Sequence, residues 1–228
     1  MATTPLLPQA FWFRLAIPCR HVSALPGGDL GEGGDDSSKL LRLDADCTLP
    51  ATPTLEGEEA WAEVRAGWNA KGLAVQVDVK QSSFLDSKQE MEPGPGFRVW
   101  VDTRDTRDVS RATRFCHCFV VRIVRGKTKT APLEVEVKQL SISRAVADAP
   151  LAAPKDLLAH AERLKQGWRV SLFLLAGALN GFDPDTNRRL GITYQISDYH
   201  REDQFLGAGR AFPLGDNPSL WTTLELRD

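Results

Sequence analysis

The sequence predicts an all-β protein that forms a single antiparallel β-sandwich with a jelly-roll-like layout. Three observations support this fold class. Apolar and polar residues alternate with a period of two from residue 61 through most of the remaining chain. Glycine, proline, asparagine and aspartate interrupt this alternation at short intervals, and only one long segment has a composition that favours a helix. Short strands with one dry face, joined by turns, follow from this pattern.

The first two strands of this region are expected to pair as a hairpin. In 61–68, small apolar residues alternate with charged residues or glycine, and in 73–79 leucine and valine share one face while Gln76 and Asp78 share the other. The segment 69–72 between them has the residues of a tight turn. Further strands are predicted at 97–101, 115–124, 133–140, 168–174, 190–196 and 220–226.

One segment, 154–165, fits two structures. Its alanine, leucine, lysine, glutamate and arginine residues favour a helix, whereas its position just before a turn and an alternating strand favours a strand in a hairpin. We prefer the strand. A single helical turn is expected at 176–179. The side chains expected in the core are Val64, Leu73, Val75, Val77, Val99, Val170, Leu172 and Ile192.

The composition limits the classes of function. The chain has 228 residues, 42% of them hydrophobic, and 28 basic against 30 acidic residues give a net charge of −2. No strong positive field is available for nucleic acid, and no run of about 18 apolar residues could cross a membrane as a helix. We expect one domain over 1–228, with a flexible loop at 26–38 that is rich in glycine, aspartate and serine.

The four cysteines are too few for a disulfide scaffold in a chain of this length. No basic stretch precedes the first apolar residues, so the amino terminus does not resemble a secretory signal. We therefore expect reduced thiols and a cytoplasmic location.

Five segments in order resemble family 9 carbohydrate-binding modules and the related DOMON-like sandwiches. Trp68–Val79 resembles a hairpin of that superfamily, and Asp216–Trp221 resembles its closing "D-P-x-x-F/W" segment. Three strands of the superfamily are similar to Phe97–Asp102, Gly167–Leu174 and Leu190–Asp198. The resemblance covers about 61–228 and implies a β-sandwich that binds a saccharide. Two tryptophans enclose the terminal sugar in the sugar-binding members. The corresponding stretches here, 91–96 and 212–216, contain no tryptophan.

A saccharide site, if the resemblance extends to binding, is expected at the rim of the sandwich. Arg98, Tyr199, His200 and Phe212 supply rings and hydrogen-bond donors there. The chain lacks the sequence fingerprints of nucleophile-elbow hydrolases, zinc proteases and dinucleotide enzymes, so we expect a non-catalytic module. Two alternatives remain open. One is a protein-interaction scaffold, and the other is a hydrolase centred on the loop 198–203.

No cofactor is expected, with calcium as the one exception that the residues allow. Asp102, Asp105 and Asp108 recur at every third position and could supply oxygen ligands. The alternative is that the neighbouring arginines pair with these aspartates and hold the loop in shape. Cys116, His117 and Cys118 contain metal-ligand types, but a strand would turn the imidazole away from both thiols.

Overall fold

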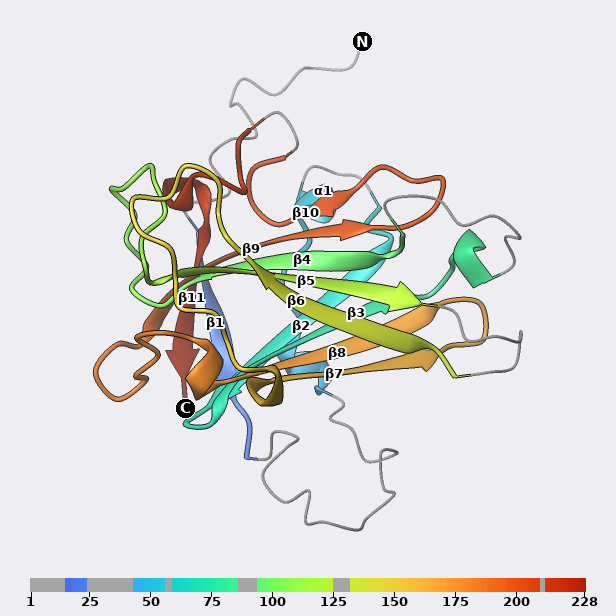
Figure 1. Ribbon diagram of the computed structural model, residues 1–228. Helices are drawn as coiled ribbons and strands as arrows, with labels where there is room; N and C mark the ends of the chain where they lie inside the picture. The colour runs from blue at the N-terminus through green and yellow to red at the C-terminus, as the bar shows by residue number, and fades with distance from the viewer. Residues whose placement is uncertain (1–14, 24–42, 56–58, 86–93, 125–131, 210–211) are drawn as a thin grey trace.

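The computed structural model describes residues 15–23, 43–55, 59–85, 94–124, 132–209 and 212–228. The predicted flexible loop at 26–38 lies outside these residues. The described residues contain eleven strands, drawn as arrows in Figure 1. They are β1 Ala16–His21, β2 Ala62–Asn69, β3 Gly72–Val79, β4 Gly96–Asp102, β5 Cys116–Val124, β6 Glu134–Leu140, β7 Leu157–Arg163, β8 Trp168–Leu175, β9 Arg189–Ser197, β10 Gln204–Phe205 and β11 Thr222–Arg227. The all-β prediction is confirmed.

Helical structure in the described residues is limited to single turns. One α-helical turn, α1, spans Thr52–Leu55. The others are short 3-10 turns, and they are η3 Ala45–Cys47, η4 Ser83–Leu85, η5 Pro154–Asp156, η6 Ala176–Ala178 and η7 Pro218–Leu220. None of these helices has the length or the apolar composition needed to cross a membrane.

The strands form one continuous sheet in the order β6-β5-β4-β9-β11-β1-β2-β3-β8-β7, with β10 attached to β9. The sheet folds over so that its two halves face each other, with β11 and β1 between them (Figure 1). The end strands β6 and β7 approach each other but do not pair. The result is a sandwich that is nearly closed into a barrel.

One strand departs from the antiparallel prediction. β1 runs parallel to both of its neighbours, β11 and β2, whereas the other strand pairs are antiparallel. A tight turn can join only antiparallel strands, and a parallel pair needs a long connection. The stretch 22–61 between β1 and β2 is long enough for such a connection. The sequence did not predict the parallel pairing, because the period-two pattern begins at residue 61, after β1.

The expected hairpin and the ambiguous segment both form strands. β2 pairs with β3 over its full length around the turn at 70–71. Gly72 begins β3 with a φ of 150°, and a Cβ there would collide with the carbonyl of Leu174 in β8. The segment 154–165 forms η5 and then β7, which pairs with β8, so the strand prediction is confirmed. Leu157 and Ala159 of β7 pack against the core.

The core lies between the two halves of the sheet. All eight side chains expected there are buried, at 2% exposure or less. The larger side chains that fill the same space include Trp168, Tyr194 and Phe119. Two smaller apolar clusters lie outside the main core, one around Trp100 and Trp221 and the other around Leu43, Cys47, Ala74 and Phe173.

Candidate functional site

The loop after β9 lies at one rim of the sandwich, and hydrogen bonds hold its first residues in place. The Asp198 carboxylate is buried and accepts a hydrogen bond from Ser82 Oγ at 2.7 Å. Ser83 Oγ donates to the Tyr199 carbonyl at 3.3 Å. Burial raises the pKa of Asp198, and the hydrogen bond from Ser82 partly opposes that shift. Asp198 therefore positions the loop, since it links the end of β9 to the segment after β3.

Tyr199 and His200 lie together but differ in exposure. Tyr199 is 4% exposed because its ring packs edge-on against Phe84, with 5.4 Å between centroids. His200 is exposed and contacts the Tyr199 ring at 6.3 Å. Its φ of 60° lies in the left-handed region, which residues other than glycine rarely adopt. The strained backbone turns His200 outward, while Tyr199 supports the loop from below.

Trp61 is a further aromatic residue at this rim, and the sequence pattern did not single it out. It comes just before β2, is half-buried, and carries the Arg201 guanidinium over its ring at 5.3 Å from the centroid. Its indole Nε1 donates to the Glu202 carbonyl at 3.2 Å, and its backbone N–H donates to Gln204 Oε1 at 3.1 Å. One sequence signal could have identified Trp61. It stands at the first position of the alternating region, and the end of a strand lies at the rim of a sandwich.

Arg98 and Phe212 lie on other segments. Arg98 is an exposed residue of β4 and pairs in register with Gln195 of β9, whose side-chain amide donates to Asp203 at 2.7 Å. Phe212 is 38% exposed. Among the described residues, no hydrogen bond, ion pair or ring contact joins either side chain to His200. Of the four residues expected in the saccharide site, Tyr199 and His200 contact each other, and the contacts of the described residues do not join Arg98 or Phe212 to them.

The loop after β4 uses its first aspartate to hold its own backbone. Asp102 is 1% exposed, and its two carboxylate oxygens accept from the backbone N–H groups of Arg104 at 2.9 Å and Thr106 at 2.7 Å. Burial raises the pKa of Asp102, although these hydrogen bonds act in the opposite direction. Both carboxylate oxygens of Asp102 therefore bind the backbone of their own loop.

The second aspartate of this loop is held by residues from other strands. Asp105 accepts from Thr223 Oγ1 at 2.8 Å and forms ion pairs with Arg107 at 3.5 Å and Arg189 at 3.3 Å. Asp108 is exposed. In the described part of the chain, no group of three or more histidine, cysteine, aspartate or glutamate side chains is placed to hold a metal ion. The geometry supports an arginine-braced loop and gives no support to the calcium expectation.

The Cys-His-Cys segment follows the alternation of a strand. Cys116 and Cys118 are buried in the outer cluster with Trp100, and His117 faces the other way and stacks on Phe119 at 5.9 Å. Burial raises the pKa of the Cys116 thiol to about 11 and that of Cys118 to about 12. All four cysteines are free and buried.

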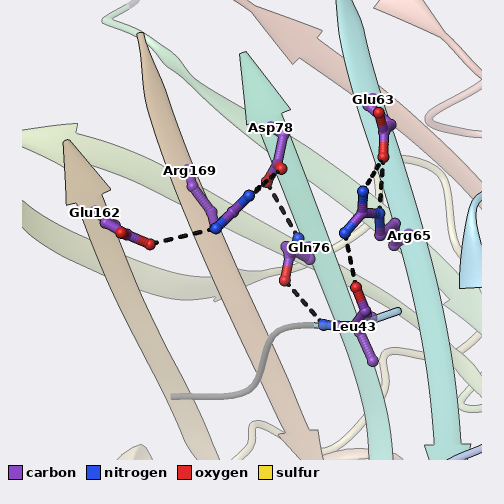
Figure 2. Close-up of polar contacts among 7 residues, drawn as sticks. All are labelled: Leu43, Glu63, Arg65, Gln76, Asp78, Glu162 and Arg169. Atoms are coloured by element: carbon purple, nitrogen blue, oxygen red, sulfur yellow. Dashed lines mark hydrogen bonds and ion pairs between the residues drawn. The ribbon is translucent and has the colours of Figure 1, made fainter. Parts of the chain in front are cut away.

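A network of paired charges covers part of the outer face of β7, β8 and β3 (Figure 2). Arg169 donates two hydrogen bonds to the Asp78 carboxylate, at 2.7 and 2.5 Å, and lies 3.4 Å from Glu162. Asp78 also accepts from Gln76 Nε2 at 3.2 Å, and Gln76 Oε1 accepts from the backbone N–H of Leu43 at 3.2 Å.

The same backbone position is held from β2. Arg65 donates to the Leu43 carbonyl at 2.7 Å, and its Nε donates to Glu63 at 2.7 Å (Figure 2). Both polar backbone groups of Leu43 are therefore bound by side chains of the sheet. These charges have partners and fix a crossing segment in place, so we assign the network a structural role.

Comparison with known proteins identifies the fold. No protein-family model and no curated protein matches the sequence. One solved structure that is similar is a family 9 carbohydrate-binding module from Caldicellulosiruptor kristjanssonii in complex with cellotriose, with a TM-score of 0.55 and 12% identity over 93% of this chain and 94% of that one. Another is a family 9 module from the same organism in complex with glucose, with a TM-score of 0.51 and 13% identity over 73% and 76%. The chain has the fold of a family 9 carbohydrate-binding module.

Proposed function

We propose that the protein is a non-catalytic module that binds saccharide at the rim formed by Trp61, His200 and Arg201. The observation that carries this proposal is the half-buried Trp61 indole at a rim of the fold shared with a module solved with cellotriose. Flat aromatic rings bind the apolar C–H face of a sugar ring, and a few fixed donors then orient the hydroxyl groups.

Each of the three residues has a distinct task in this proposal. Trp61 supplies the ring, and its hydrogen bonds to Glu202 and Gln204 fix the orientation of the indole. Arg201 lies over that ring in the free protein, so a bound sugar takes its place and leaves the guanidinium N–H groups to donate to hydroxyls. His200 is held outward by its backbone conformation. Tyr199 supports the loop and has no direct contact with the sugar.

Two of the three acidic residues of the same loop are already bound to neighbouring side chains, which favours binding over hydrolysis. Hydrolysis of a glycoside needs two carboxyl groups that face the same bond from about 5 to 9.5 Å apart. Asp198 is buried against Ser82, and Asp203 accepts from Gln195 on the outer face of β9. Asp198 and Asp203 are thus each bound to a neighbouring side chain, and Glu202, the third acid of the loop, is exposed and uses its backbone carbonyl to accept from Trp61.

Calorimetric titration and thermal unfolding with glucose, cellotriose and a panel of other oligosaccharides test the proposal. A ligand at a hundred times its Kd stabilises the folded state by about 2.7 kcal/mol. We expect Trp61→Ala to weaken saccharide binding at least tenfold. The matched control is Phe212→Ala, because Phe212 is an exposed aromatic residue outside the proposed site.

Three results would contradict the proposal. The first is no heat and no thermal shift with any saccharide. The second is loss of binding in Phe212→Ala with full binding in Trp61→Ala, which would move the site to the segment that the resemblance first suggested. The third is turnover of a glycoside or ester that disappears in Asp198→Ala and His200→Ala, which would make the loop 198–203 catalytic.

A further inference from the structure

Two cations beside Trp61 have no ion-pair partner within the described residues. One is Arg201, which is half-buried and holds its guanidinium over the Trp61 ring. The other is Lys80, an exposed residue that directly follows β3. An unpaired cation at a ligand site can form charge-assisted hydrogen bonds with an anionic group of the ligand.

The strand register places Lys80 next to Trp61. Ala62 of β2 pairs with Val79 of β3, so the next positions along the same ladder, Trp61 and Lys80, are neighbours at the strand ends. Neighbouring strands lie about 4.8 Å apart. The two cations therefore come from different segments, the end of β3 and the loop after β9, that meet at one tryptophan.

The turn between β7 and β8 extends this row of cations. Val79 pairs with Trp168 of β8, which pairs with Arg163 of β7. Arg163 and Lys165 are exposed, and within the described residues neither forms an ion pair. Figure 1 shows this turn, the end of β3 and the loop after β9 at the same end of the sandwich, on the right. From β2 to β7 the row spans three strand spacings, or about 14 Å, close to the length of a trisaccharide.

The acids of β3 and β7 do not neutralise the row. Asp78 and Glu162 are the nearest acids on these two strands, and both pair with Arg169 on the outer face of the sheet. The exposed cations at the ends of the same strands, Lys80 and Arg163, thus have no free carboxylate on their own strand in the described residues.

The acids on the other side of Trp61 are partly engaged. The Asp198 carboxylate is buried against Ser82, and Asp203 accepts from Gln195. Glu59 and Glu202 are exposed and precede or follow the Trp61–Arg201 contact in the chain. The negative groups therefore gather on the loop side of Trp61, and the positive row runs from Trp61 toward β7.

We propose that the rim selects an acidic saccharide, a chain of hexuronic acid units whose carboxylates pair with Arg201, Lys80 and Lys165 along the strand ends. This inference rests on the proposed function, because Trp61 supplies the ring on which one unit stacks. A carboxylate accepts two parallel hydrogen bonds from a guanidinium, and such charge-assisted bonds are roughly twice as strong as bonds between neutral groups. The row extends beyond one sugar unit, so the affinity increases with chain length.

Calorimetric titration of the full chain with tri-galacturonate and with its fully methyl-esterified form tests the selection. The two ligands share their rings and hydroxyl groups and differ in charge. We expect tri-galacturonate to bind at least tenfold more tightly than the ester, and at least tenfold more tightly than monomeric galacturonate. Added sodium chloride should weaken binding of the acid and leave binding of the ester unchanged, because salt screens exposed charges.

Two lysine variants test the location. Lys80→Gln should lower the ratio of acid affinity to ester affinity at least threefold. Lys155→Gln is the matched control and should leave this ratio unchanged, because Lys155 is also exposed but lies in η5, before the opposite end of β7. Arg201→Gln should lower the ratio at least fivefold, because the guanidinium supplies two parallel donors. Both lysines are exposed, so neither change should prevent folding.

The failures of this inference and of the proposed function differ. Equal affinity for the acid and the ester would overturn the selection of an acidic saccharide and leave the saccharide site in place. Equal ratios in Lys80→Gln and Lys155→Gln, or equal affinity for the trimer and the monomer, would overturn the row of cations. A sulfated trisaccharide that binds as tightly as tri-galacturonate would overturn the choice of a carboxylate. Absence of heat with the acid, the ester and every neutral saccharide would overturn the proposed function itself.

Discussion

The two halves of the sheet have similar inner faces, but a network of paired charges lies on the outer face of one half. On the outer side of β4 and β5, the side chains of Trp100, Cys116 and Cys118 are buried in an apolar cluster with Trp221. On the outer side of β3 and β8, Asp78 and Arg169 form a paired-charge network beside a small apolar cluster of Ala74, Phe173, Leu43 and Cys47. The inner faces of both halves contribute mainly leucine, isoleucine, valine and aromatic residues to one core.

The difference arises from the segments that cover each half. Trp221, just before β11, returns to the first half, where its indole N–H donates to the Leu214 carbonyl at 2.7 Å. The second half is crossed by the segment that begins at Leu43, whose backbone is held by Gln76 and Arg65. Trp221 excludes water from Trp100, Cys116 and Cys118 and makes this face a second core. Leu43 packs on Ala74 and Phe173 in a smaller cluster, and the charges beside that cluster need partners.

The largest effect should come from removing the cover of the apolar side. Trp221 is 1% exposed, and its replacement by alanine leaves a cavity and an unsatisfied Leu214 carbonyl. We expect Trp221→Ala to lower the free energy of unfolding by about 3–5 kcal/mol. Urea unfolding followed by circular dichroism measures this. Phe212→Ala is the control and should change stability by less than about 1 kcal/mol; equal effects would show that the outer cluster is not a core.

The second prediction concerns the strand that carries this cluster, since His117 lies between Cys116 and Cys118 and faces inward. Burial lowers the pKa of His117 to about 4, below the value of about 6.5 in an unfolded chain. Between these pH values the unfolded state binds more protons than the folded state. The free energy of unfolding should therefore fall as the pH falls through this window, by up to about 3 kcal/mol in total.

His117→Gln should remove that part of the pH dependence. The measurement is urea unfolding of the wild type and the variant at several pH values between 7 and 4, with the difference between the two proteins taken at each pH. The control is His160→Gln, because His160 is a half-buried residue of β7 in the other half of the sheet. A difference between wild type and His117→Gln that stays constant with pH would contradict a buried neutral imidazole.

On the polar side, the loss of stability should depend on whether one partner of an ion pair or both are removed, and the smallest loss should come from the most exposed pair. Arg169→Met leaves the buried Asp78 carboxylate without its guanidinium and should cost about 2–4 kcal/mol. The double variant Arg169→Met with Asp78→Leu should recover most of this loss, because a paired charge replaced by apolar groups is nearly neutral. Glu63→Gln breaks a more exposed pair with Arg65 and should cost less than about 1 kcal/mol. Thermal unfolding of all three variants measures these losses. If the double variant were the least stable, the two charges would stabilise the protein by more than their mutual pairing.

The sequence by itself determined the class of fold and the inner face of the sandwich. Val64, Leu73 and Ile192 are buried as expected, because period-two alternation is a local property that places side chains on one side of a strand wherever the strand lies. The same local rule separated His117 from Cys116 and Cys118. The segment 154–165 fits two structures because its residues favour a helix while its position favours a strand, and pairing with β8 overrode the helix propensity.

Only the tertiary structure decided which polar residues meet and which aromatic residues reach the surface. Arg169 and Asp78 are 91 positions apart, and the register between β3 and β8 brings them together. Trp61 and Arg201 meet because β2 and the loop after β9 end at the same rim, and Tyr199 is buried because Phe84 packs against it. These contacts depend on strand order and on how loops return over the sheet, and alternation along one strand contains no information on either.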